Sequence, residues 1–189
     1  AATAATLSLK LRQFASGSVY DETREVLPAH EAKLDALESL YEELAGEPII
    51  VAVAFKHEVD AIRKRIGNVG GAPIPYVGGG MARGEMAKVQ TRWNMGWLPI
   101  LLAHPTSVAY GLNLQTGGYN VCWYSMTFNG EEYDQLISRV YRTGQRRRVM
   151  NYRIEARGTI DEYLWKVVGA KGKTQANMLQ SLRDYYNVK

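Results

Sequence analysis

The stretch Ile49-Ile50-Val51-Ala52-Val53-Ala54-Phe55 decides how this chain folds. It is continuously apolar and rich in β-branched residues, and it is too short for a buried helix. A strand of this kind is covered on both faces, which is typical of parallel sheets enclosed by helices. Just before it, leucines recur at helical spacing over residues 30–44, and Gly46 and Pro48 end that pattern. We therefore expect a helix that leads into a central, buried strand.

The same alternation continues outward along the chain. We expect strands at 74–77, 100–103, 121–124 and 149–154, and helices at 57–66, 83–94, 131–141, 159–168 and 174–186. Short apolar strands that alternate with longer helices specify an α/β fold with right-handed crossovers. The fold class is therefore α/β, with three layers and a mainly parallel central sheet flanked by helices. Residues 1–29, partly helical at 7–14, form an approach segment, and residues 30–189 form the domain with its C-terminal helices.

Composition is that of a folded protein. The chain has 189 residues, of which 46% are hydrophobic and 22% are charged, so a wholly disordered chain is excluded. Cys122 is the single cysteine, which favours a reducing compartment and a role as a small core residue. No apolar run reaches the roughly 20 residues that a membrane-spanning helix needs. We expect a cytoplasmic protein.

The chain is basic, with a net charge of +4, which permits nucleic-acid binding but does not establish it. Five arginines fall close together, at positions 139, 142, 146, 147 and 148. Such a cluster is also typical of a solvated basic turn.

The segment Gln135-Leu136-Ile137-Ser138-Arg139-Val140-Tyr141-Arg142-Thr143-Gly144-Gln145 carries the clearest chemistry. Gln135, Arg139 and Arg142 are spaced four and three apart, which predicts that they share one helical face. Two guanidiniums side by side suit a polyphosphate, because each offers a planar fork of donors and keeps its charge. Surface ion pairs with neighbouring acids, Glu131, Glu132 or Asp134, are the structural alternative.

This segment resembles the sixth motif of superfamily-two motors in its Snf-type form. Residues 101–115 resemble the fifth motif, residues 49–58 the fourth, and Gly158-Thr159-Ile160-Asp161-Glu162 a further stretch of the family. The resemblance runs in consistent order from about residue 10 to 182. It implies the C-terminal, RecA-like lobe of a helicase or translocase ATPase, of a compact phage, prophage or bacterial type. Ser138, His104-Pro105 and Met86 depart from the usual pattern.

The resemblance also implies roles for individual residues. Arg139 and Arg142 would act as arginine fingers on a triphosphate held by the other lobe, while Gly111, Asn113 and Gln135 would lie near the nucleotide. Four residues would contact nucleic-acid phosphates: Lys56, His57, Thr106 and Ser107. For Thr106 and Ser107 the alternative is local capping of their own loop, and for Lys56 and His57 it is a solvated helix start.

The implied ligand is ATP with Mg²⁺ in the complete motor, and none is expected on this lobe alone. No strand leads into a glycine-rich lysine loop, and the nearest approach, residues 169–174, follows a helix instead. No histidine has a partner at metal-binding spacing, so no metal site is expected. The implied partners are the N-terminal RecA-like lobe of the same protein and double-stranded DNA, bound without regard to sequence. A stand-alone module that binds nucleic acid or protein, without ATPase function, is the alternative.

Overall fold

The computed structural model describes residues 4–109, 111–127 and 129–168. Its centre is a parallel sheet of five strands in the order β6-β7-β3-β8-β9. The strands are β3 (Ile49–Ala52), β6 (Tyr76–Val77), β7 (Ile100–Ala103), β8 (Asn120–Trp123) and β9 (Met150–Arg153). As expected from its sequence, β3 is central, and Ile50 pairs with Leu101 on one side and Val121 on the other.

Alternate residues of each strand point to opposite faces of the sheet and so build two cores. Ile50, Leu101 and Trp123 belong to one cluster, while Val51, Leu102 and Cys122 belong to the other. All six side chains are fully buried. Cys122 is thus a core residue, as the sequence predicted, and burial raises the pKa of its thiol to about 12.

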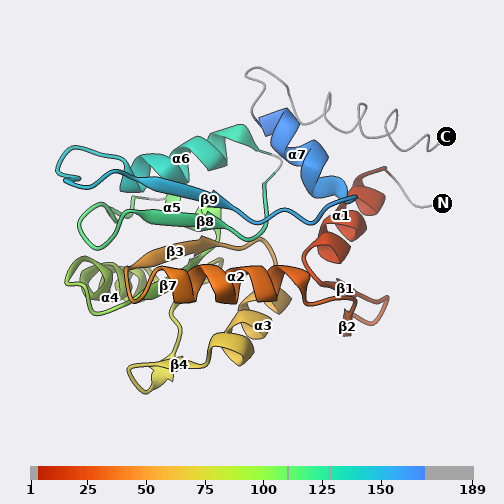
Figure 1. Cartoon of the computed structure of the whole chain (residues 1–189), viewed down its shortest axis with the longest axis horizontal. Helices are drawn as coiled ribbons and strands as arrows, with labels where there is room; N and C mark the ends of the chain where they lie inside the picture. Colours follow the sequence, from red (N-terminus) through yellow and green to blue (C-terminus); the bar gives the residue numbers. More distant parts are fainter. Residues whose placement is uncertain (1–3, 110, 128, 169–189) are drawn as a thin grey trace.

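Helices cover both faces of the sheet (Figure 1). One face is covered by α2 (Ala32–Glu43) and α3 (Lys56–Ile66), and the other by α4 (Arg83–Asn94), α5 (Pro105–Ala109), α6 (Gly130–Val140) and α7 (Ile160–Val168). Trp93 on α4 is fully buried beneath its helix, and Trp123 is equally buried in β8. Both rings are therefore part of the core. No described helix is long and apolar enough to cross a membrane.

Residues 4–28, which precede α2, pack onto the rest of the lobe. They form α1 (Ala4–Ala15) and a hairpin of β1 (Ser18–Tyr20) and β2 (Val26–Pro28). Ala15 is fully buried in the core, and the hydroxyl of Tyr124 donates to the carbonyl of Ser16 at 3.2 Å. α1 also packs against α7. The segment covers the end of the sheet where the parallel strands finish (Figure 1).

Some expected elements differ in detail. Residues 105–109 form a short helix where a loop was expected, and the strand expected at 74–77 shrinks to two residues because Pro75 has no N–H to donate to a ladder. The β1–β2 hairpin and a smaller one, β4 (Asn68–Val69) with β5 (Ala72–Pro73), were not expected. The helix expected at 174–186 and the glycine-containing turn at 169–174 lie outside the described residues.

Candidate functional site

The sequence-predicted site residues divide between opposite edges of the sheet. Lys56, His57, Thr106 and Ser107 directly follow β3 and β7 and so lie at the edge where parallel strands end, the carboxyl edge. Asn113 and Arg142 precede β8 and β9 and lie at the opposite, amino edge. The segment that follows β7 does not stay at the carboxyl edge. After α5 the chain returns along the sheet before β8 begins, which carries Asn113 to the far end.

At the amino edge, the fold brings two predicted nucleotide-site residues into contact. Arg142 Nη1 donates to Asn113 Oδ1 at 2.6 Å, although the two residues are 29 positions apart in the chain. Both side chains are exposed, and no described residue forms an ion pair with Arg142. The alternative of a surface ion pair with Glu131, Glu132 or Asp134 therefore receives no support for Arg142.

The loop that carries Asn113 is anchored from two helices. The amide N–H of Leu114 donates to the carbonyl of Arg139 at 3.1 Å, and Trp93 Nε1 donates to the carbonyl of Leu114 at 2.9 Å. Two amide side chains of α4, from Gln90 and Asn94, also bind the backbone of Asn113. The position of Asn113 is thus fixed by backbone and core contacts and does not depend on loop conformation alone.

Arg142 does not lie on the α6 helix. The helix ends at Val140, because Tyr141 leaves the helical region with ψ 84°. Gln145 stabilises this ending, since its Nε2 donates to the carbonyls of Gln115 and Gly118, each at 2.9 Å. The prediction that Gln135, Arg139 and Arg142 share one helical face is therefore wrong: only the first two share the helix, and the loop after it presents Arg142.

The remaining predicted nucleotide residues lie close to this pair in the chain, on α6 just before Arg142 or just before Asn113. Arg139 is half-buried in the last turn of α6, and Gln135 lies one turn earlier with an exposed side chain. Gly111 has a φ of 107°, a conformation that disfavours any residue with a Cβ. A cleft of about 460 Å³ is lined in part by Gln115, Tyr119, Gln145 and Arg147, and none of the predicted nucleotide residues lines it.

Of the four predicted nucleic-acid contacts at the carboxyl edge, only one has an exposed side chain. Lys56 is exposed, but His57 is only 4% exposed and its ring stacks on Phe55. Burial lowers the pKa of His57, which favours the neutral ring and removes a cation from this surface. Ser107 is buried and its amide donates to the carbonyl of His104, while Thr106 Oγ1 donates to Glu132 at 3.0 Å. The Thr106 hydroxyl is thus bound to α6, and the Ser107 amide is used in the first turn of α5. Neither bond is a side-chain cap of the residue's own loop.

A cavity of about 370 Å³ lies at this same edge, among the ends of β3, β7 and β8. Arg12 reaches it from α1, where its Nη2 donates to the carbonyl of Met126 at 2.8 Å and its guanidinium lies 5.3 Å from the centre of the Phe55 ring. Burial lowers the pKa of Arg12, yet a guanidinium stays charged at physiological pH. Arg12 lies outside every sequence motif, and only the packing of α1 against the sheet brings it to this cavity.

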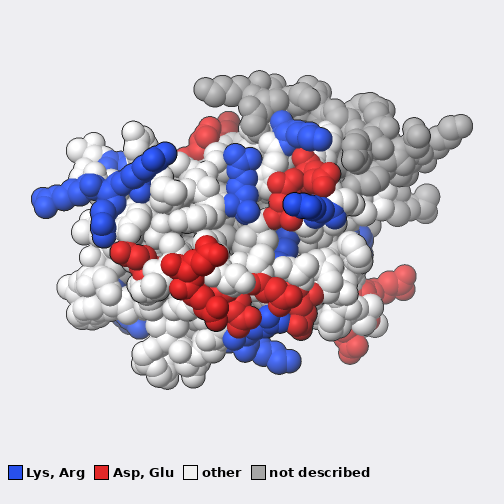
Figure 2. Space-filling view, viewed as in Figure 1, with Lys and Arg blue, Asp and Glu red and all other residues white. Residues whose placement is uncertain are grey.

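Charge is unevenly distributed over the surface. Figure 2 shows an acidic band over α2 and cationic side chains at the end of the molecule formed by the α6–β9 loop. The band contains Glu31, Asp35, Glu38, Glu42 and Glu43, and the loop contains Arg142, Arg146, Arg147 and Arg148. Arg65 on α3 bonds to three of these acids, Glu31, Asp35 and Glu38. An anionic ligand is therefore favoured at the amino edge and disfavoured along α2.

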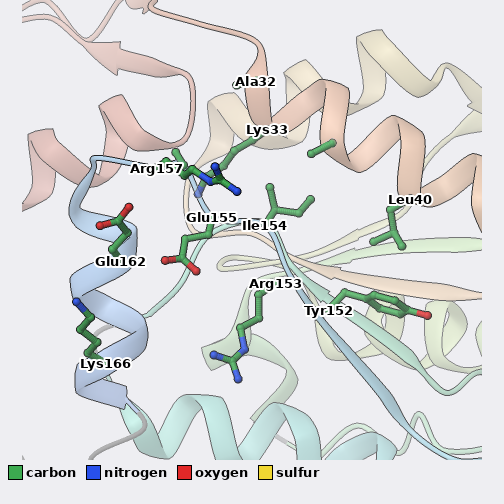
Figure 3. Close-up of a pocket in the computed structure, with 12 residues that line it drawn as sticks. Ala32, Lys33, Leu40, Tyr152, Arg153, Ile154, Glu155, Arg157, Glu162 and Lys166 are labelled. Carbon is green, nitrogen blue, oxygen red and sulfur yellow. The ribbon is translucent and has the colours of Figure 1, made fainter.

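A larger cavity, of about 730 Å³, opens between α2, the end of β9 and α7 (Figure 3). Its lining mixes cations, such as Arg153 and Lys166, with acids such as Glu155 and Glu162. None of the predicted site residues lines it. Among the described residues, no cluster of His, Cys, Asp or Glu could hold a metal ion.

The fold and these motifs define a RecA-like α/β lobe that presents an arginine at one sheet edge. The match of residues 32–144 to the helicase conserved C-terminal domain shows that the chain belongs to that family. The resemblance to the C-terminal lobe of superfamily-two helicases is thereby confirmed.

Individual relatives agree with this assignment. Protein p41 of Acyrthosiphon pisum secondary endosymbiont phage 1 is 33% identical over 186 residues, which cover 95% of this chain and 38% of p41. YwqA of Bacillus subtilis (strain 168), whose name describes an ATP-dependent helicase or translocase, is 23% identical over 163 residues, covering 85% of this chain and 18% of YwqA. The chain thus spans well under half of either relative.

The fold is also that of part of a solved ATPase domain. The crystal structure of the C-terminal part of the Fun30 ATPase domain matches with a TM-score of 0.69 at 17% identity, over 82% of this chain and 52% of that one. This likeness confirms the RecA-like, three-layer fold.

Proposed function

We propose that this lobe completes the ATP site of a two-lobed motor that moves along double-stranded DNA, with Arg139 and Arg142 as its arginine fingers. The observation that carries the proposal is the contact between Arg142 and Asn113 at the exposed amino edge. Two residues from separate motifs meet there, near the cationic side chains that gather at the end of the molecule formed by the α6–β9 loop (Figure 2).

The residues present fit one side of a triphosphate. Arg142 Nη1 is held by Asn113, while the exposed guanidinium keeps further donors for phosphate oxygens. The sequence holds no glycine-rich lysine loop, so the remaining phosphate contacts and the Mg²⁺ ligands would come from an N-terminal lobe. The isolated chain should accordingly bind ATP weakly and show no meaningful turnover.

In the hydrolytic step, water would form a bond to the terminal phosphorus as the bond to the bridging oxygen breaks, releasing ADP and phosphate. Negative charge shifts onto the bridging oxygen as that bond breaks. Arg139 and Arg142 would stabilise this charge, an effect worth about a thousandfold or more in related phosphoryl transfers. Lys56 would bind DNA phosphates at the carboxyl edge, where it is the most exposed of the four predicted contacts.

The test uses the complete two-lobed protein and compares Arg142→Ala with Arg148→Ala. Both arginines are exposed and lie in the same loop, but only Arg142 contacts Asn113. DNA-stimulated ATP turnover should fall at least about a hundredfold in Arg142→Ala and stay near the parent value in Arg148→Ala. Arg142→Lys should rescue little, because an ammonium cannot reproduce the two-pronged contact. Parent-level turnover in Arg142→Ala would refute the assignment and favour a binding module without ATPase function.

A further inference from the structure

Asn113 is clamped on both sides of its backbone by one helix. Its amide N–H donates to Gln90 Oε1 at 3.2 Å, and its carbonyl accepts from Asn94 Nδ2 at 2.8 Å. Gln90 and Asn94 are four residues apart on α4 and therefore project from the same helical face. The side chain of Asn113 leaves this clamp toward the α6–β9 loop, where it accepts from Arg142.

The direction of each hydrogen bond is fixed by chemistry. A backbone N–H only donates, so Gln90 must present its oxygen, and a backbone carbonyl only accepts, so Asn94 must present its nitrogen. Asn94 Oδ1 is buried and makes no hydrogen bond within the described residues. The polar contact of the Asn94 side chain is thus the one that it makes with Asn113.

The end of α4 that carries Asn94 is fixed in the core. Trp93, next to Asn94, is fully buried and donates from Nε1 to the carbonyl of Leu114, the residue after Asn113. An exposed arginine has large rotamer freedom, and a misplacement of about 1 Å can cost about a hundredfold in rate. A fixed acceptor at Asn113 would reduce that freedom for Arg142.

We propose that Gln90 and Asn94 are positioning residues. They orient the side chain of the catalytic arginine, Arg142, by holding the backbone of Asn113 in place. This inference rests on the proposed function, since it assigns residues that serve the same ATP site. Neither residue touches the nucleotide in this scheme. They act on Arg142 indirectly. Each of them binds the backbone of Asn113, and the side chain of Asn113 accepts a hydrogen bond from Arg142.

The test replaces each amide by its isosteric acid in the complete two-lobed protein. Gln90→Glu keeps an oxygen that accepts from the Asn113 N–H and should retain turnover within about threefold. Asn94→Asp places a carboxylate oxygen against the Asn113 carbonyl and should lower kcat about tenfold or more. The KM values for ATP and DNA should stay near those of the parent, because the loss falls on the reaction step.

Two further variants separate positioning from mere folding. Thr91→Ala is the matched control, because Thr91 is exposed on the same helix and its hydroxyl donates only to the carbonyl of Ala87. It should leave kcat unchanged. Asn94→Asp in an Arg142→Ala background should cause no additional loss, since residues that act through one group are not additive.

The outcomes distinguish this inference from the proposed function. Severe loss in Arg142→Ala together with parent-like turnover in Asn94→Asp would overturn the positioning role and leave the arginine assignment intact. Equal losses in Gln90→Glu and Asn94→Asp, or additive losses in the double variant, would overturn it as well. Parent-like turnover in Arg142→Ala would overturn both proposals together.

Discussion

Replacing Asp161 by alanine would leave the ammonium of Lys33 buried without its counter-charge. Lys33 Nζ lies 2.5 Å from Asp161 Oδ2, and the two side chains are only 2% and 5% exposed. Lys33 also donates to the carbonyl of Tyr124 at 2.9 Å, and Asp161 accepts from the amide of Ala156 at 3.0 Å. The pair joins α2 to the first turn of α7 beside the cavity of Figure 3.

The expected cost follows from this burial. Removing one member of a buried ion pair typically costs about 3 to 5 kcal/mol, because the remaining charge is left without compensation. A domain of this kind is stable by about 5 to 15 kcal/mol, so the loss is a large fraction of the total. For a chain of this size, about 2 to 4 °C of melting temperature is lost per kcal/mol, which gives a fall of about 6 to 20 °C.

The assay is urea unfolding of the lobe followed by circular dichroism, with two comparison variants. Lys88→Ala removes an exposed lysine paired with Glu85 at 2.7 Å, and it should leave the unfolding free energy nearly unchanged, because exposed ion pairs contribute little. Lys33→Met combined with Asp161→Leu removes both charges and should recover part of the loss, since apolar replacements of buried pairs are often tolerated. If Asp161→Ala and Lys88→Ala destabilise the lobe equally, the burial argument fails.

Two other properties can be checked directly. Cys122 is fully buried and burial raises the pKa of its thiol to about 12, so at pH 8 it is a neutral thiol and should react with a disulfide reagent only as the lobe unfolds. Reaction at the rate of a free thiol in the folded protein would contradict this. DNA binding by the isolated chain should be weak, indifferent to sequence and lost as salt rises, because phosphate contacts dominate. Tight binding at high salt, or strong preference for one sequence in a titration, would count against a backbone-binding surface.

Local pattern was sufficient to predict the layered architecture. The run at 49–55 has no polar residue to place in water, so it had to become the covered central strand. The helix expected at 83–94 has the same bounds in the structure, because residues at helical spacing, Val89 and Trp93 among them, require one buried face. The end of α6 was placed one residue late, since Gln145, which holds the following loop, acts through carbonyls 27 and 30 residues away.

The sequence by itself determined the fold class, the family motifs and which arginines belong to the motif at 135–145. Each of these depends on residues close together in the chain. Only the tertiary structure decided which motif residues meet. Arg142 lies outside its helix and contacts Asn113, whereas Thr106, seven positions before Asn113, lies at the opposite edge of the sheet. Likewise, α1 covers the carboxyl edge and helps to bury it. The physical reason is that a segment that runs alongside a strand carries residues close together in the chain to opposite edges of the sheet. No local sequence pattern shows where such a segment ends.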